Sequence, residues 1–574
     1  MTQTNHLGLA TAGLFGALAA LGPSAPAAAC GGFFCDQTQP VEQAAERIIF
    51  HRGGDGTVTA VIQIRYAGPA EEFAWVLPVA GRPAVGVSSD LAFTRLSNAT
   101  SPQYILTTTV DGACYVDPPP SLQDGGFAAA DASAGPSGPD PGEVTVVDSG
   151  AVGPYDYVIL SLTPGAPEPA SVAVEWLREN GYQIDPSGAA RLAPYLEGGM
   201  NLLAFRLTKG TDAGSIRPVV LGFGAGLATI PIRPTAVAAV ADMPMIVWVL
   251  GPHRAIPVNY RALELNEALI DWLDPTTTYD AVVTEAANQA GGQGFVTEMS
   301  GPAGELSTVV FSDGEEARWA SLTDRATWEA PWWRVTDAIG DFRRYDGMGD
   351  VIAATVPLPD GVDADQLEAC PWCFSEPEGF ADAFDVDAFL AAMEALVIEP
   401  MRVTRRLFDT SSVVTRFYTT MSADEMTRDP SFAFNPDLAP IDRTRRARRV
   451  IECSPDVRLP DAPWRVVLSN GLVVRGRGNR WPYRAGAGMP ANARILRYGT
   501  EGQGDVLIDN SAAIAAALPH RDERLASPPS TPPPGSGGLM EAMGCHAAPG
   551  GSGGAWALAL LAFAALGRRS RGRG

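Results

Sequence analysis

The chain has 574 residues, 46% of them hydrophobic, with 42 Lys and Arg against 65 Asp and Glu and a formal net charge of −23. This length is enough for about three domains and does not limit the size of a core. The acidic balance argues against nucleic acid and anionic membrane surfaces as general partners.

The N-terminus has the features of a secretory signal peptide. An apolar region covers residues 7–21, and three alanines ending at Ala29 directly precede Cys30. This pattern predicts cleavage after Ala29, so that residues 1–29 are removed and the mature chain is exported. A lipoprotein site would also make Cys30 the first mature residue, but Ala27 occupies the position where such sites prefer Leu.

Residues 30–143 are predicted to be rich in strands. Residues 57–66 alternate between apolar and polar side chains, and the apolar run 73–79 follows a Gly-Pro turn. Both patterns are typical of sheet strands. Residues 125–142 are Ala, Gly, Ser, Pro and Asp with almost nothing to bury, so we expect a disordered insert there.

Residues 144–400 predict a mixed unit of sheet and helix, and hence an α+β fold class. Strands are expected at 157–162, 201–207, 216–223 and 245–250. Helices are expected at 171–180 with Ser171 as N-cap, 187–196, 259–273 with Asn259 as N-cap, 279–289, and 385–398 ended by Pro400.

Residues 401–525 form a predicted C-terminal α+β part. Segments 464–468 and 471–475 are strand candidates, and the Asn470-Gly471 pair between them predicts a hairpin. Residues 526–544 are rich in Pro, Ser and Gly, which is typical of an extended stalk.

The order of residue types in the last thirty residues, 545–574, is typical of a segment that stops in a membrane. Gly544 and Cys545 precede a small-residue spacer, an apolar stretch at 555–566, and an arginine tail that includes Arg568 and Arg569. The apolar stretch alone is shorter than the roughly 20 residues that cross a bilayer, but the spacer extends it to a short membrane span with the arginines in the cytoplasm. The order resembles the myxobacterial C-terminal sorting signal (MYXO-CTERM). That resemblance implies removal of the span and attachment at the cell surface through lipid on Cys545.

Seven cysteines are present, and all except Cys545 form an even set for an oxidising compartment. Six cysteines permit 15 pairings. The spacing favours two local bridges and one long-range bridge, namely Cys30 with Cys35, Cys370 with Cys373, and Cys114 with Cys453. The long-range bridge would stabilise the fold by about 4 to 5 kcal/mol on the chain-entropy model.

Cys370 and Cys373 also have the spacing of a thiol redox site, so a thiol-disulfide enzyme is the alternative hypothesis for function. The nearest clear helix starts a dozen residues later, so a structural bridge is favoured. A zinc site would need two more soft ligands, and the Cys30–Cys35 pair has the wrong, wider spacing for a zinc ribbon, so zinc is not favoured.

Histidine is scarce, because only His51 and His253 lie in the expected ectodomain before the C-terminal segment. No Ser of the ectodomain stands in a G-x-S-x-G motif, which weakens a hydrolase hypothesis. The glycine-rich run 222–226 is interpreted as a strand leading into a turn rather than a nucleotide loop.

Asp382, Asp385 and Asp387 could offer oxygen ligands to calcium. The favoured interpretation is an acidic helix start, because the EF-hand spacing is absent.

Two further clusters have more than one interpretation. Trp328, Trp332 and Trp333 could form an exposed aromatic platform, although burial is the default for Trp. The arginines between Arg443 and Arg449 could bind an anionic polymer, although ion pairs within the acidic chain are favoured.

Several of these segments together resemble the secreted family DUF 2330 over roughly residues 30–380. They are the Cys30 to Cys35 start, the strand 73–79, and the segments 176–182 and 201–207. The resemblance implies export and one integrated ectodomain, and it carries no catalytic residues. We therefore predict an exported, surface-anchored, non-enzymatic protein without cofactors, which binds an envelope or extracellular partner or organises the envelope.

Overall fold

The structure is a computed structural model, which describes residues 35–36, 39–40, 42–67, 74–115, 145–162, 168–182, 188–207, 217–486 and 488–518. Several predictions lie outside these residues: the signal peptide, the insert 125–142, the stalk, the C-terminal motif, and the Cys30–Cys35 bridge with its neighbour Ala29. The same holds for Gly544, Cys545, Arg568 and Arg569. No helix within the described ranges is long and apolar enough to cross a bilayer.

A ten-stranded sheet takes strands from the early, middle and late parts of the chain. Its order is β23-β22-β15-β16-β17-β13-β3-β4-β11-β6. Their bounds are β3 (Glu42–Arg52), β4 (Thr57–Ala67), β6 (Ala84–Val87), β11 (Val219–Ala225), β13 (Met243–Gly251), β15 (Arg261–Leu265), β16 (Gly294–Pro302), β17 (Val413–Met421), β22 (Asn492–Arg497) and β23 (Asp505–Asp509). Every residue of β13 is buried, as expected for an apolar strand in the middle of a sheet covered on both faces.

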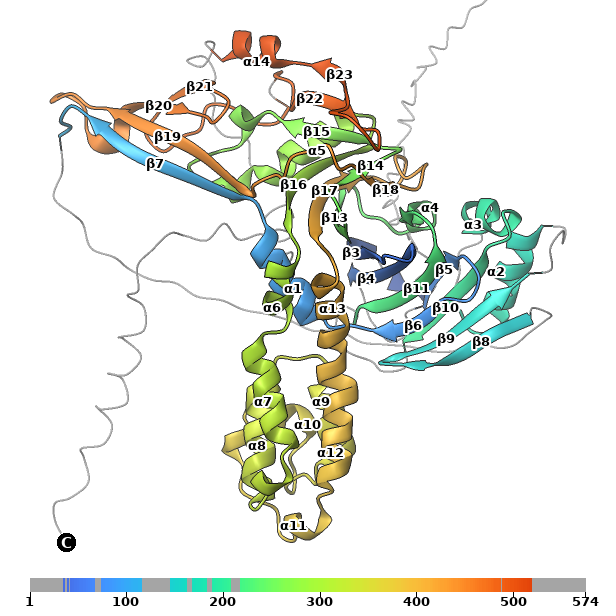
Figure 1. The fold of residues 1–574 in the computed structure, drawn as a ribbon. Helices are drawn as coiled ribbons and strands as arrows, with labels where there is room; N and C mark the ends of the chain where they lie inside the picture. Colours follow the sequence, from blue (N-terminus) through green and yellow to red (C-terminus); the bar gives the residue numbers. More distant parts are fainter. Residues whose placement is uncertain are drawn as a thin grey trace, which may run out of the picture.

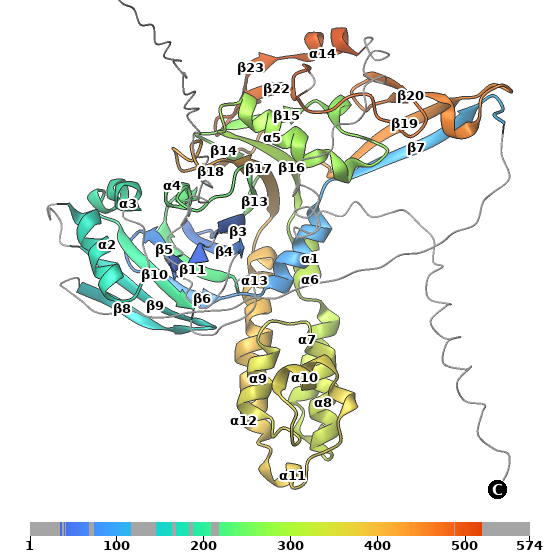
Figure 2. The same ribbon diagram turned by 180° about the vertical axis from the view of Figure 1, so that it is seen from behind.

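A second, four-stranded antiparallel sheet lies against one face of the first. Its order is β5 (Ala74–Val79), β10 (Asn201–Leu207), β9 (Tyr155–Ser161) and β8 (Thr145–Val152). Because side chains alternate along a strand, Leu203 and Phe205 face the large sheet, whereas Leu202 and Ala204 face helices α2 (Pro169–Glu179) and α3 (Gly188–Glu197). Figures 1 and 2 show this sheet and its helices on one side of the molecule.

The other side carries a long ribbon of strands. Strand β7 (Gln103–Asp111) pairs in parallel with β19 (Thr444–Glu452), which continues through β20 (Pro463–Val467) and β21 (Val473–Arg477). The predicted bridge between Cys114 and Cys453 is present beside the end of this pair. The predicted hairpin is confirmed as well, and Gly471 in its turn has a φ of +81°, which favours glycine.

A helical arm is inserted between β16 and β17 and projects away from the sheets (Figure 1). Its helices are α6 (Gly304–Val310), α7 (Asp313–Thr323), α8 (Pro331–Phe342), α9 (Met348–Thr355), α10 (Ala364–Ala369), α11 (Phe380–Ala383), α12 (Val386–Met393) and α13 (Glu399–Asp409). The prediction that Pro400 ends a helix is wrong. A π-helical turn at Glu394–Ile398 joins α12 to α13, and Pro400 lies in the first turn of α13, where a missing N–H is tolerated.

Three other predictions about helices need correction. Residues 259–273 do not form one helix, because β15 pairs with β16 and β22, and only a short 3-10 turn follows it. The part predicted as strand-rich contains helix α1 (Asp90–Thr100). Helix α2 begins at Pro169, so Ser171 is not its N-cap.

The remaining elements are small or peripheral. They are β1 (Cys35–Asp36), β2 (Gln39–Pro40), β12 (Ala228–Thr229), β14 (Ala255–Pro257), β18 (Ser431–Phe434), α4 (Ile232–Thr235), α5 (Tyr279–Gln289) and α14 (Ser511–Ala517). Helix α5 confirms the helix predicted at 279–289. Together these elements confirm the predicted α+β fold class.

Candidate ligand-binding cavity

A cavity of about 620 Å³ lies between the two packed sheets. Its floor is one face of the large sheet. Alternation along the strands places on this face Glu46, Ile48 and Phe50 of β3, Val58, Ala60 and Ile62 of β4, and Leu221, Phe223 and Ala225 of β11. The register aligns Phe50, Ala60 and Leu221 in one row across the middle of the floor. A volume of this size is typical of a small-molecule site.

The walls come from the second sheet and the segments next to it. Strand β5 contributes Leu77 and Val79, the turn after it contributes residues 80–82, and Tyr195 and Met200 come from α3 and its C-terminal end. Residues 224–227 and 229–231, together with Asp429, complete the described lining. The glycine-rich run 222–226 is therefore the end of β11 and the edge of the cavity, as the strand-to-turn interpretation predicted.

Two of the charged lining groups are already bound within the protein. Asp429 accepts hydrogen bonds from the Tyr195 hydroxyl at 2.7 Å and from the backbone N–H of Ile232 at 3.1 Å. Arg82 donates from Nε to Asp148 at 2.9 Å, and 61% of its side chain is exposed. These groups are paired, so neither needs a ligand to satisfy its charge.

Glu46 is the exception among the charged lining groups. The residue is 5% exposed, and its side chain accepts one long hydrogen bond, from Gln43 Nε2 at 3.5 Å. Burial raises the pKa of Glu46 to about 7, and the Gln43 bond opposes the rise only partly. Register pairs Glu46 with Ile64 and Met245, so it lies at one end of the floor, beyond the row of Ile48 and Ile62.

A second cavity of about 310 Å³ lies beside β15 and β16, next to Tyr104 and Tyr279. It is lined by three glutamates, but each of them has an arginine partner: Glu264 with Arg494, Glu267 with Arg445, and Glu298 with Arg416. It is smaller and its charges are balanced, so the cavity between the sheets is the better candidate.

The Cys370–Cys373 disulfide is present in the arm. Cys370 is the C-cap of α10, and Pro371–Cys373 form a 3-10 turn. A redox thiol is activated at a helix N-terminus, whereas a helix C-terminus disfavours the thiolate. The local geometry therefore supports a structural bridge.

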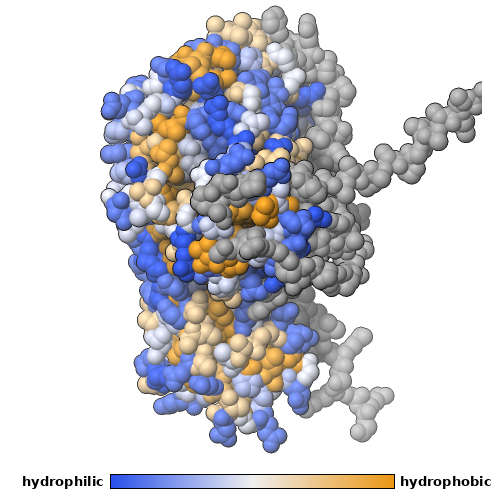
Figure 3. Space-filling model, turned by 90° about the vertical axis from the view of Figure 1, so that its right-hand side faces the viewer, coloured by the Kyte–Doolittle hydropathy of each residue, from blue (hydrophilic) through white to orange (hydrophobic). Residues whose placement is uncertain are grey.

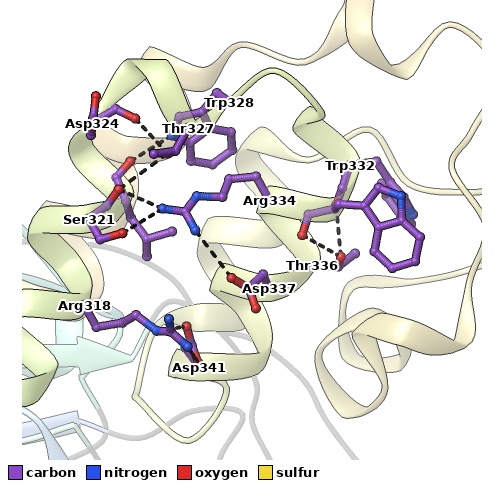
Figure 4. A network of polar contacts seen from close by, with 12 residues as sticks. Arg318, Ser321, Asp324, Thr327, Trp328, Trp332, Arg334, Thr336, Asp337 and Asp341 are labelled. Carbon is purple, nitrogen blue, oxygen red and sulfur yellow. Dashed lines mark hydrogen bonds and ion pairs between the residues drawn. The ribbon is translucent and has the colours of Figure 1, made fainter.

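The three tryptophans do not form a platform. Trp328 and Trp332 are 7% and 4% exposed and pack in the arm, whereas Trp333 is 68% exposed. The expectation of burial is thus confirmed for two of the three. Figure 4 shows Trp328 and Trp332 beside a polar network in which Arg334 donates to the Ser321 carbonyl at 2.7 Å.

The aspartates of the arm act at helix ends. Asp385 is the N-cap of α12 and accepts from the N–H of Asp387 at 2.9 Å and of Ala388 at 3.1 Å. Asp387 pairs with Arg325, and Asp382 lies in the first turn of α11. In the part of the chain that the structure describes, no group of three or more His, Cys, Asp or Glu side chains is arranged to hold a metal.

The arginines of the 443–449 stretch belong to β19 and the residue before it. Arg445 pairs with Glu267 at 3.6 Å, and the Arg449 guanidinium lies 5.3 Å from the centre of the Trp464 ring. Arg446 and Arg448 are exposed. The stretch thus combines internal contacts with an exposed edge, and it does not touch the cavity between the sheets.

His51 and His253 play no part in the cavity. Neither His51 nor His253 is in its lining, and the His51 ring lies 3.3 Å from the Thr410 hydroxyl. Burial lowers the pKa of His51.

Sequence reasoning missed Glu46, Tyr195 and Asp429 as site residues. For Glu46 a local signal existed, because a carboxylate occupied the same face as Ile48 and Phe50 in an alternating strand. No local signal existed for Tyr195 and Asp429, which meet across 234 residues of sequence.

On the face seen in Figure 3, hydrophilic regions alternate with separate hydrophobic patches. A model of the family described as uncharacterized protein conserved in bacteria (DUF2330) matches residues 24–312. No curated protein and no solved structure matches the chain. Because the family match covers half of the sequence, the chain belongs to the DUF2330 family.

Proposed function

We propose that this DUF2330 protein is an exported binding protein that holds an apolar small molecule in the cavity between its two sheets. The observation that carries the proposal is the composition of the cavity. Its floor consists of eight apolar side chains and Glu46, and it is large enough for a ligand of ordinary size. The described lining has no His, Cys, Ser or Lys, and its hydroxyls are already bound within the protein: Tyr195 donates to Asp429, and Thr229 is hydrogen-bonded to Ser431.

Export and anchoring complete the proposal. The signal-peptide pattern before Cys30 and the sorting-signal pattern at Cys545 support a surface location. The Cys114–Cys453 and Cys370–Cys373 disulfides fit the same oxidising environment. Intact-mass analysis of native protein from the membrane fraction tests this part: we expect a chain that begins at Cys30 and ends near Cys545 with added lipid mass. An unprocessed tail would contradict it.

Binding is tested with N-phenyl-1-naphthylamine, a neutral dye whose fluorescence rises in apolar surroundings. The wild-type protein should bind the dye with a saturable rise in fluorescence. The Ala60→Phe variant, which places a ring in the middle of the floor, should bind it at least about tenfold more weakly, since a lost apolar contact region of this size costs more than about 1.4 kcal/mol.

Ala515→Phe is the matched control, because Ala515 is exposed on α14 and does not line the cavity. Circular dichroism and thermal unfolding confirm that both variants fold. A wild-type protein without saturable binding, or equal binding by Ala60→Phe, would reject the proposed function.

A further inference from the structure

The cavity contains one charged group whose partner is not supplied by the described part of the protein. Asp429 has its tyrosine and its backbone donors, and Arg82 has Asp148. Glu46 has only the 3.5 Å contact with Gln43, and none of the ion pairs among described residues includes it. A buried carboxyl with a single weak partner is costly unless something else satisfies it.

The charges of the lining residues indicate which ligand charge fits the end of the cavity at Glu46. Arg47 follows Glu46 in β3, but alternation directs it to the opposite face of the sheet. Among the described lining residues the only cation is Arg82. It belongs to the turn after β5, close to the start of β6, which pairs with β11 at Gly222. Phe223 lies at the end of the floor near Arg82, whereas Glu46 lies at the opposite end.

The distance between the ends gives the shape of the ligand. From Glu46 to Phe50 the strand advances four residues, or about 13 Å. The face along this path is apolar, since Ile48, Phe50, Ala60 and Ile62 line it. An elongated apolar body fits along the strands, with its polar group at one end.

We propose that the cavity binds a cationic amphiphile, with an ammonium group against the Glu46 carboxylate and an alkyl chain along the floor. The ammonium supplies both the positive charge and the hydrogen-bond donors that Glu46 lacks, and charge-assisted hydrogen bonds of this kind are stronger than neutral ones. A fatty acid places a second carboxylate beside the first and is disfavoured. This inference rests on the proposed function, because it names the ligand class of the same cavity.

The experiment compares three ligands of equal chain length as competitors of the neutral dye, each below its micelle concentration: dodecylamine, dodecanol and dodecanoic acid. We expect the wild-type protein to bind dodecylamine at least about tenfold more tightly than dodecanol, and dodecanoic acid the most weakly. Glu46→Gln should remove the preference for the amine, so that the variant binds dodecylamine no more tightly than dodecanol. Glu501→Gln, at an exposed position outside the cavity, is the matched control and should keep the preference.

Equal affinity of the wild type for amine and alcohol would overturn the proposal, and so would a preference for the fatty acid or an amine preference that survives Glu46→Gln. Those results leave the binding function standing, because the alcohol still competes with the dye. A wild-type protein that binds neither the dye nor any of the three ligands rejects the proposed function itself.

Discussion

Glu298 of β16 and Arg416 of β17 form an ion pair in the interior, with side chains that are 1% and 0% exposed and a separation of 2.5 Å between Oε2 and Nε. A β-bulge makes the contact possible, because Thr297 pairs with Phe417 and Met299 with Arg416, so that Glu298 is the extra residue. The Tyr279 hydroxyl donates to Glu298 Oε1 at 2.6 Å, and Arg416 Nη1 donates to groups at the end of α1. The pair therefore connects the sheet to α1 and α5.

Removing one partner of this pair should destabilise the protein strongly. Arg416→Met leaves Glu298 buried without its cation, which typically costs about 3 to 5 kcal/mol. Urea unfolding followed by tryptophan fluorescence measures the change. Arg497→Met is the control, because Arg497 and its partner Asp505 are 57% and 66% exposed, and such pairs contribute about 0 to 1 kcal/mol. A loss below about 1 kcal/mol for Arg416→Met would contradict the role of the pair.

The two disulfides should differ in their effect on stability. Cys114 and Cys453 are 339 residues apart, whereas Cys370 and Cys373 are three apart. On the chain-entropy model, a loop of this length gives roughly 6 kcal/mol for the long-range bridge, and the short one contributes about 2 kcal/mol. Thermal unfolding of the Cys114→Ser/Cys453→Ser and Cys370→Ser/Cys373→Ser variants tests this order. An equal or larger loss for the short bridge would show that loop length does not decide the effect.

The elements that were predicted well carry their signal locally. The Asn470-Gly471 turn is encoded by residues that tolerate a positive φ, and the apolar run of β13 is itself the signature of a covered strand. Helix α1 was not predicted, and its buried end depends on a distant contact: Thr100 and the C-cap Ser101 accept hydrogen bonds from Arg416, more than 300 residues away. For residues 261–265, pairing with β16 and β22 overrode a helical pattern.

The candidate cavity was harder to predict than these elements, because the segments that form its floor and its walls are distant in sequence. The alternating pattern of β4 showed which residues share a face, but not that this face meets β5 and Tyr195. Only the packing of the two sheets reveals that Glu46 is enclosed among apolar side chains.

Glu315 should make the arm sensitive to acid. Although burial alone would raise the pKa of Glu315, hydrogen bonds from Arg95, Tyr345 and Ser312 lower it to about 2. A lowered pKa means that the stabilisation is present above the unfolded value near 4.5 and is lost as the pH falls towards 2. Glu315 also completes the capping box of α7 with Ser312.

The Glu315→Ala variant should therefore be less stable than wild type by roughly 1 to 2 kcal/mol at pH 7, which is the usual cost of a lost cap. The difference should shrink as the pH falls from 4.5 to 2. Urea unfolding at pH 7, 4 and 2.5 measures it, with exposed Glu501→Ala as the control. A difference that stays constant over this range would show that the charge of Glu315 does not contribute.

Glu46 should give a pH dependence of the opposite sign. Because burial raises its pKa from 4.5 to about 7, the folded protein holds a proton that the unfolded chain releases between these values. The contribution of Glu46 to stability is therefore fully present below about pH 4.5 and is lost as the pH rises towards 7. Glu46→Gln removes this loss, so the free energy of unfolding of the variant should equal that of wild type at pH 4.5 and exceed it at pH 8 by on the order of 3 kcal/mol.

Glu368, whose pKa burial also raises to about 7, titrates in the same range but is present in both proteins, so the comparison cancels its effect. Urea unfolding at pH 4.5 and pH 8 measures the difference in free energy of unfolding between wild type and Glu46→Gln. If that difference does not grow with pH, Glu46 ionises freely in the folded protein. Its carboxylate would then have no need of a cationic ligand.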